Sequence, residues 1–273
     1  MLIIDSHVHL WATGKPSAAH RQVSSFAAEQ LIREMDEAGV DAGVIQPPAW
    51  DVTSNEVAVE AARRYPRRYA VLGWTALERP EALGLVQGWN QRPGMLGFRF
   101  TFSEPHQHSW PTDGTLEGLC AAAERAGLPV ALACGNFLPI VGEIAARHPA
   151  LKLLVDHLGA PLRSIDEAAY ANLPQVLALA KHPNIAIKAS AAPGYSSHAY
   201  PFLNVHPYLK AVYDAFGPER MFWGTDITRM PCTYRQCVTL FTEELPWLSE
   251  ADKELVMGRA LCKWIGWSDY LKD

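Results

Sequence analysis

Residues 1–10 read MLIIDSHVHL, in which the apolar run Leu2–Ile4 leads directly to two histidines, His7 and His9. The run predicts a buried strand over Leu2–Ser6. Successive side chains alternate between the two faces of a strand, so His7 and His9 project to the same side. Two imidazoles at the exit of a buried strand suit metal binding or the polarisation of a carbonyl group. A pair of histidines satisfied by backbone carbonyls is the structural alternative.

Apolar runs of the same kind recur along the chain, mostly with a segment of helical spacing before each. The later runs are Ala42–Gln46, Tyr69–Trp74, Leu96–Thr101, Pro129–Ala133, Lys152–Asp156, Asn184–Ala189 and Met221–Gly224. Helical spacing occurs at Ala27–Ala38, Ser54–Arg64, Leu116–Ala126, Tyr234–Glu244 and Glu250–Leu261. Continuous apolar strands that alternate with helices are typical of a parallel sheet.

Eight such units in a chain of 273 residues predict an α/β fold, a single closed (β/α)8 (TIM) barrel with an extra C-terminal helix. We expect one domain over residues 1–273, because no low-complexity tract or long linker divides the chain. The alternative is a doubly wound open sheet, whose first strand–helix turn carries a glycine-rich phosphate loop. His7 and His9 occupy that turn here, which favours the barrel.

The composition excludes several classes of protein. The formal net charge is −5 and no basic stripe stands out, so nucleic acid is not an expected partner. No apolar stretch approaches the ~20 residues that span a bilayer. The N-terminal run has no basic region before it and is interrupted by Asp5, which argues against a signal peptide. Five cysteines without a C-x-x-C motif fit reduced thiols in a cytoplasmic protein.

Functional residues of a (β/α)8 barrel lie where the strands end. Because such a barrel closes its eighth strand against its first, Asp226 should adjoin the histidine pair, placed to ligate a metal or to take a proton from a water. A helix N-cap is the structural alternative for Asp226. His157 should face the pair from across the barrel, or else be a bonded core histidine. The catalytic candidates are His7, His9, His157 and Asp226.

Two charged side chains lie within apolar runs and require an anionic partner. Arg99 would either clamp a substrate carboxylate or pair internally with Asp156 or Glu104, and Lys188 poses the same question. Trp50 and Arg229 also follow strand ends and could contact a ligand. The substrate-binding candidates are therefore Arg99, Trp50, Lys188 and Arg229.

The loops after the fourth and seventh runs, residues 102–112 and 191–205, are long and predict a substrate lid. The first contains a second His-x-His, His106 and His108, whose loop-like flanks favour solvated side chains. Cys134, after the fifth run, fits a small buried residue better than a nucleophile.

At this point the chain resembles the amidohydrolase superfamily, specifically its lactonase and decarboxylase branch. The resemblance rests on Asp5–His9, Gly97–Arg99, Val155–Pro161 and Gly224–Asp226, which run in order through nearly the whole chain. It implies that histidines polarise a lactone carbonyl, that the aspartate of strand eight activates water, and that arginines hold substrate carboxylates. It also implies a homodimer.

The resemblance has one departure that bears on metals. Many members of the wider superfamily carry a histidine after strand five and a lysine or other ligand after strand four, where this chain has Cys134 and Arg99. A two-metal site is therefore not expected. One divalent metal such as zinc, held by His7, His9 and Asp226 with His157 as an optional fourth ligand, and a metal-free site both stay open.

Three functions are compatible with these candidate residues. The first is hydrolysis of a lactone or related cyclic ester, of a carboxylated or sugar-derived small molecule, by water that Asp226 activates while the histidines stabilise the oxyanion. The second is a metal-dependent decarboxylase or hydratase that acts on an unsaturated or aromatic carboxylic acid. The third is a non-catalytic barrel that binds a small acid. An anionic small molecule is the expected partner in each.

Overall fold

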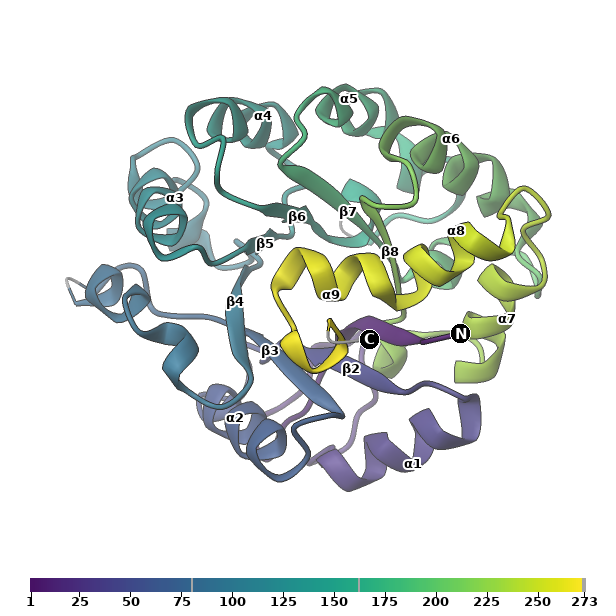
Figure 1. Ribbon diagram of the computed structural model, residues 1–273, viewed down its shortest axis with the longest axis horizontal. Coiled ribbons are helices and arrows are strands. Elements are labelled where there is room, and N and C mark those ends of the chain that lie inside the picture. Colours follow the sequence, from purple (N-terminus) through teal and green to yellow (C-terminus); the bar gives the residue numbers. More distant parts are fainter. Residues whose placement is uncertain (80, 162, 272–273) are drawn as a thin grey trace.

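Eight parallel strands form one barrel in the computed structural model, which describes residues 1–79, 81–161 and 163–271 (Figure 1). Each strand pairs with the next in chain order, from first to eighth. The strands are β1 Ile4–Val8, β2 Ala42–Ile45, β3 Tyr69–Gly73, β4 Met95–Phe100, β5 Val130–Leu132, β6 Leu153–Val155, β7 Ile185–Ser190 and β8 Met221–Gly224. The predicted (β/α)8 barrel is confirmed.

The helices surround the barrel, as Figure 1 shows. They are α1 Ala28–Ala38, α2 Ser54–Arg64, α3 Thr115–Ala126, α4 Leu138–Arg147, α5 Leu173–Ala178, α6 His206–Phe216, α7 Tyr234–Thr242, α8 Glu250–Glu254 and α9 Ala260–Ile265. Between β3 and β4 the described residues form short 3₁₀ turns at Ala82–Val86 and Trp89–Gln91 instead of an α-helix.

Several predicted boundaries were wrong by one or two residues, among them the end of the helix predicted at Tyr234–Glu244, and two elements have a clear structural reason for the difference. The first strand does not span Leu2–Ser6, because its pairing with β2 begins at Ile4 and continues to Val8. The last helix is not continuous over Glu250–Leu261, because a π-helical segment at Leu255–Arg259 separates α8 from α9. Gly258 in that segment lies against β1, where a Cβ atom would be 3.1 Å from the Leu2 carbonyl oxygen.

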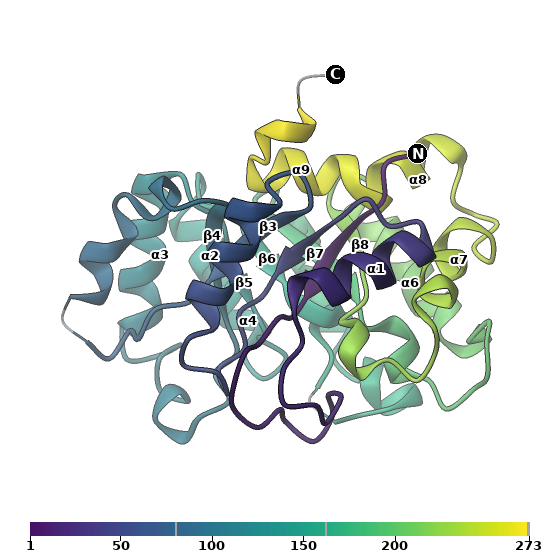
Figure 2. The same ribbon diagram turned by 90° about the horizontal axis from the view of Figure 1, so that it is seen from below.

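The inside of the barrel is apolar at the end where the strands begin. Ile4, Leu72, Leu154 and Phe222 pack there with smaller residues, and α9 seals this end with apolar side chains such as Leu261. Figure 2 shows the C-terminal helices at this end of the molecule and the long loops at the other. A site for chemistry must therefore lie at the ends of the strands, under those loops.

The seam between β1 and β8 is closed by Asp5 rather than by a full strand ladder. Its carboxylate accepts hydrogen bonds from the Thr225 amide at 2.8 Å, the Tyr234 hydroxyl at 2.7 Å and the Thr225 hydroxyl. Burial raises the pKa of Asp5 to about 6 against these donors. Gly224 allows the close approach, since a Cβ atom there would lie 2.2 Å from the Ser6 hydroxyl oxygen. Asp5 therefore holds the two strands that carry most of the site.

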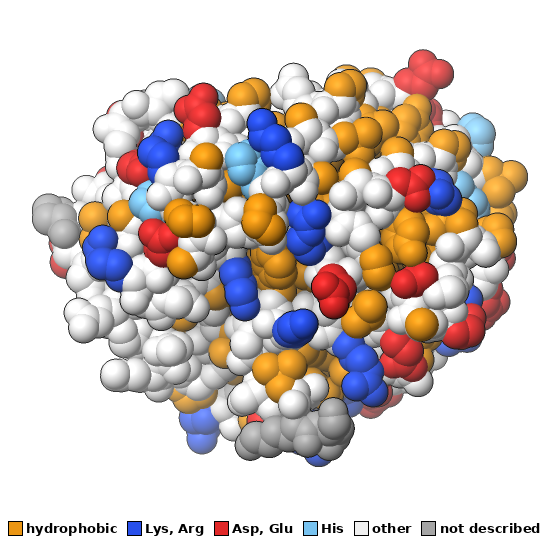
Figure 3. Space-filling view, turned by 45° about the horizontal axis from the view of Figure 1, so that its top comes forward, with side chains coloured by type: hydrophobic (Ala, Val, Ile, Leu, Met, Phe, Trp, Pro, Cys, Tyr) orange, Lys and Arg blue, Asp and Glu red, His pale blue; other side chains and the backbone are white. Residues whose placement is uncertain are grey.

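Charges of both signs are interspersed with apolar side chains on the face drawn in Figure 3, where several basic side chains lie around the middle of the view. Among the described residues, no helix combines the length and apolarity that crossing a membrane requires.

Candidate active site

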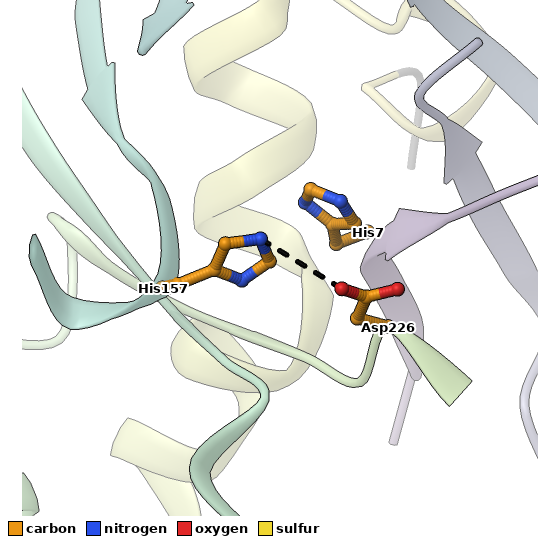
Figure 4. Close-up of side chains that lie close together, drawn as sticks. All are labelled: His7, His157 and Asp226. Carbon is orange, nitrogen blue, oxygen red and sulfur yellow. Dashed lines mark ion pairs between the residues drawn. The ribbon is translucent and has the colours of Figure 1, made fainter. Parts of the chain in front are cut away.

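Two site residues adopt left-handed backbone conformations just beyond their strands. His157 after β6 has φ 54° and Asp226 after β8 has φ 56°. Non-glycine residues rarely adopt this conformation, which costs of order 1 kcal/mol or more. At both positions the turn directs the side chain of a predicted catalytic residue toward the barrel axis. Figure 4 shows the result, with His157 reaching across the barrel toward His7 and Asp226.

The four predicted catalytic residues come together. His7 Nε2 lies 3.3 Å from His9 Nε2, and His9 Nε2 lies 3.3 Å from Asp226 Oδ1. His157 Nε2 is 3.8 Å from Asp226 Oδ2. All four side chains are buried or nearly so, with His157 the most exposed at 13%. Burial lowers the pKa of His7 and of His157 well below the usual range, so both rings are neutral at pH 7.

The Nδ1 atom of each histidine has a different hydrogen-bond partner, and we infer from these partners which ring nitrogen carries the hydrogen. His9 Nδ1 donates to the Gln46 carbonyl oxygen at 2.5 Å, which leaves a lone pair on Nε2. His157 Nδ1 lies 2.8 Å from the Ser190 hydroxyl oxygen. The Nδ1 atom of His7 lies 3.0 Å from the Lys188 ammonium nitrogen, which donates to it and places the ring hydrogen on Nε2.

Below the histidines lies a second charged group centred on Asp156. Its Oδ1 lies 2.8 Å from Lys188 Nζ, and its Oδ2 accepts from Arg99 Nε at 2.9 Å. Burial alone would raise the pKa of Asp156, but the two cations hold it well below its usual range. Of the two interpretations left open for Arg99, the internal pair with Asp156 is therefore formed, and Glu104 lies exposed in its loop. Lys188 is fully buried beneath His7, so it presents no surface to a ligand.

Asp226 is held from one side only. Arg229 Nε donates to Oδ2 at 2.5 Å, and the Arg229 Nη2 atom also lies 3.4 Å from the Tyr195 hydroxyl. Burial alone would raise the pKa of Asp226, but the Arg229 guanidinium holds it well below its usual range. Oδ1 is buried and accepts no hydrogen bond from the described residues. It faces the lone pair of His9 Nε2, so two acceptors oppose each other across 3.3 Å.

His20 also belongs to this site, and sequence reasoning missed it. Its Nδ1 lies 2.7 Å from the Thr228 hydroxyl and 3.8 Å from Asp226 Oδ1. Its ring packs on Trp50, with centroids 4.8 Å apart, and Trp50 in turn contacts His9. Burial lowers the pKa of His20 to about 4. His20 lies in the loop between β1 and α1, where no period or motif distinguishes it from a solvated histidine.

The second His-x-His and Cys134 have the structural surroundings that the sequence favoured for them. His106 and His108 are exposed in the loop after β4, and His106 packs on Trp110. Cys134 is fully buried, and burial raises the pKa of its thiol.

Two overlapping triplets of side chains could hold a metal ion, and Asp226 belongs to both. One is His7, His157 and Asp226; the other is His9, His20 and Asp226, each with its ligand atoms within 4.8 Å of one another. A histidine that binds a metal donates its other nitrogen to an acceptor. His9 meets that condition through Gln46, whereas Nδ1 of His7 faces a cation. The opposed acceptors of Asp226 and His9 therefore fit a cation better than His7 does.

Comparisons with known proteins agree in fold. A family model described as amidohydrolase matches residues 4–260. An L-fucono-1,5-lactonase from Burkholderia ambifaria is 27% identical over 235 residues, covering 82% of this chain and 79% of that protein. An amidohydrolase from Burkholderia multivorans, solved with bound zinc, superposes with a TM-score of 0.83 at 23% identity, over 97% of this chain and 99% of that one. A probable 2-pyrone-4,6-dicarboxylic acid hydrolase from Acinetobacter baumannii, solved with citric acid, gives 0.75 at 19% identity, over 97% and 100%.

Proposed function

The chain belongs to the amidohydrolase family and is a hydrolase, and we propose that it opens a lactone ring with a water held at Asp226. One observation carries this proposal. Asp226 Oδ1 is a buried carboxylate oxygen that accepts no hydrogen bond from the described residues, while Oδ2 is fixed by Arg229. Most buried polar atoms are paired, so an unpaired carboxylate oxygen that lies 3.3 Å from His9 Nε2 at the barrel mouth supports the binding of a reacting molecule there.

In the proposed reaction, the water oxygen attacks the lactone carbonyl carbon while Asp226 Oδ1 takes a proton from that water. Nε2–H of His157, whose Nδ1 lies against the Ser190 hydroxyl, donates to the developing oxyanion. The tetrahedral intermediate then breaks its ring C–O bond, and the leaving alkoxide recovers the proton from Asp226. His7, turned by Lys188 so that Nε2 carries hydrogen, supports His9 across 3.3 Å.

For the substrate we propose a sugar-derived lactone without additional carboxylates. The two arginines at the mouth are each committed to an aspartate, Arg99 to Asp156 and Arg229 to Asp226. Neither of these two side chains is therefore free to bind a substrate carboxylate. The likeness to L-fucono-1,5-lactonase supports the same choice. The anionic substrate expected from the sequence stays a prediction that the Arg99 variant described below can test.

A single divalent metal is compatible with this site. Asp226 Oδ1 and His9 Nε2 would hold it, with His20 completing the triplet, and the zinc in the Burkholderia multivorans structure supports the choice of metal. When bound, such an ion would lower the pKa of a coordinated water and polarise the carbonyl. Ligation by His7, and membership of His157 in the ligand set, stay predictions.

The proposal is tested by supplying the purified protein with a panel of 1,5-sugar lactones, including L-fucono-1,5-lactone, and with 2-pyrone-4,6-dicarboxylate, while proton release is followed. We expect turnover of sugar lactones that is lost in Asp226→Asn and kept in the exposed control Asp214→Asn. Full activity in Asp226→Asn would contradict the mechanism. Carbon dioxide release from aromatic acids, abolished by a chelator, would instead support the decarboxylase alternative.

A further inference from the structure

Two cysteine thiols lie in contact at the start of α7. The sulfur atoms of Cys232 and Cys237 are 3.5 Å apart, and both cysteines are free. Cys237 is buried at 2% exposure, while Cys232 is only partly buried. The other three cysteines are fully buried in the core. One member of the contacting pair is therefore reachable from solvent and the other lies directly behind it.

The start of the helix fixes this contact. Thr233 is the N-cap of α7, its hydroxyl accepts from the Gln236 amide at 3.2 Å, and the Gln236 side chain bonds back to the Thr233 amide at 3.1 Å. In such a capping box, the residue before the cap packs against the fourth helical residue. Those two positions are Cys232 and Cys237. The Cys237 backbone is further anchored because its carbonyl accepts from Trp223 Nε1 at 3.1 Å.

The same position favours the reactive form of Cys232. Helix N-termini carry partial positive charge and stabilise a thiolate, which is the nucleophilic form of cysteine. The hydrogen bond with Cys237 lowers the pKa of Cys232. A disulfide requires sulfurs about 2.05 Å apart, so closing the 3.5 Å contact moves them together by roughly 1.5 Å.

We propose that Cys232 and Cys237 form a reversible oxidation site, which hydrogen peroxide converts to an intrachain disulfide. The Cys232 thiolate attacks the peroxide, so that an S–O bond forms and the O–O bond breaks. The departing hydroxide takes up the proton that the Cys232 thiol released on ionising and leaves as water. The Cys237 thiol then attacks the sulfenic sulfur. An S–S bond forms, the S–O bond breaks, and the departing hydroxide takes the Cys237 proton to leave as a second water. Two thiols are oxidised and one peroxide is reduced.

The experiment uses the position of Arg235 between the two cysteines. Trypsin places Cys232 in the peptide 230–235 and Cys237 in the peptide 236–253, so the disulfide joins two separate peptides. The full-length protein is treated with one equivalent of hydrogen peroxide, alkylated and analysed as intact protein and as tryptic peptides. We expect the chain to lose the mass of two hydrogen atoms, the two peptides to appear linked, and dithiothreitol to reverse both changes.

Variants separate this site from general oxidation. Cys232→Ser and, separately, Cys237→Ala should abolish the linked peptide, whereas Cys120→Ala should keep it; using two variants guards against one that fails to fold. If peroxide only adds oxygen atoms, or links other cysteines, or forms the linked peptide irreversibly, the proposal is overturned. None of these results depends on lactone turnover.

Discussion

Asp156 and Asp226 are two buried carboxylates at the mouth of the same barrel, and they differ in one oxygen. Both of the Asp156 oxygens face cations, Lys188 and Arg99. Asp226 has one oxygen on Arg229 and the other without a hydrogen bond from the described residues. Asp156 Oδ1 makes an ion pair with Lys188 and no hydrogen bond, but each Asp156 oxygen has its own cation. A carboxylate with a cation at each oxygen stabilises its neighbours, whereas one with a cation at a single oxygen can bind a water, a proton or a metal. Both aspartates are buried, so the difference between Asp156 and the candidate base Asp226 lies in how their oxygens are paired.

The sharpest test of this contrast is Asp226→Asn. Removing a positioned general base slows proton transfer by about 10²- to 10⁴-fold, so we expect kcat on a sugar lactone to fall by that factor. The amide can still accept from Arg229, whose side chain is 22% exposed to solvent, so the loss of stability should be smaller than the loss expected for Asp156→Asn. A variant that is as active as the parent, or that is unfolded, would contradict the catalytic role assigned to Asp226 and the structural role assigned to Asp156.

Asp156→Asn should act mainly on stability. The substitution leaves Lys188 and Arg99 buried without a counter-charge, and breaking a buried ion pair from one side costs about 3–5 kcal/mol. We expect the free energy of unfolding, measured by urea titration with circular dichroism, to fall by that amount. Asp214→Asn, at an exposed pair with Lys210, should be within about 0.5 kcal/mol of the parent.

Arg99→Met tests whether the charged group around Asp156 also contacts the substrate. A lost charged hydrogen bond to a ligand costs about 2–5 kcal/mol, or roughly 30- to 5,000-fold in affinity. Because Arg99 is committed to Asp156, we expect equal losses of kcat/KM on neutral and carboxylated lactones, together with lower stability. A loss confined to carboxylated lactones would identify a substrate clamp, as one interpretation of the sequence proposed.

Asp51 is another buried carboxylate, held like Asp5 by neutral donors instead of cations. It accepts from the amides of Ala12 at 2.8 Å and Thr53 at 2.8 Å, and from the Thr53 hydroxyl at 2.6 Å. Burial opposes ionisation, but these donors lower the pKa of Asp51 from 3.8 to about 2.

A lowered folded-state pKa stabilises the fold above the unfolded pKa of 3.8 and loses that contribution as pH falls through about 2. Comparing the parent with Asp51→Asn should reveal a stability gap of about 2 kcal/mol at pH 5 that narrows between pH 4 and pH 2. The measurement is urea unfolding at several pH values. A gap that does not vary with pH would show that the carboxylate charge is not what the donors stabilise.

The fold was predictable because hydrophobic runs of strand length repeat eight times, and barrel closure then implied that Asp226 meets His7 and His9. What failed depended on tertiary contacts. The first strand ends where its pairing with β2 ends, which apolarity alone does not mark. Whether Arg99 meets a substrate or Asp156 depends on which side chain β6 presents to β4, and the sequence left both interpretations open.

His20 was missed because its loop reaches the site only by folding back onto the loop after β8. The Arg21 amide donates to the Thr228 carbonyl at 2.8 Å, and this contact brings His20 beside Asp226 Oδ1. Loop residues show no periodicity that could reveal such a contact in advance.

His20→Phe gives the smallest expected effect and the finest test of the unpaired oxygen. Phenylalanine keeps the packing on Trp50 and removes the nitrogen beside Asp226 Oδ1, whereas His20→Gln keeps a polar group and loses the ring. A neutral hydrogen bond contributes about 0.5–1.5 kcal/mol, or roughly 2- to 12-fold. We expect His20→Phe to lower kcat by that factor with KM nearly unchanged, because the nitrogen acts beside the water-binding oxygen.

If His20 acts instead by packing on Trp50, KM should rise for His20→Gln alone. The exposed control, His106→Ala, should leave both constants unchanged. If His20→Phe matches the parent in both, His20 serves only to close the loop over the site.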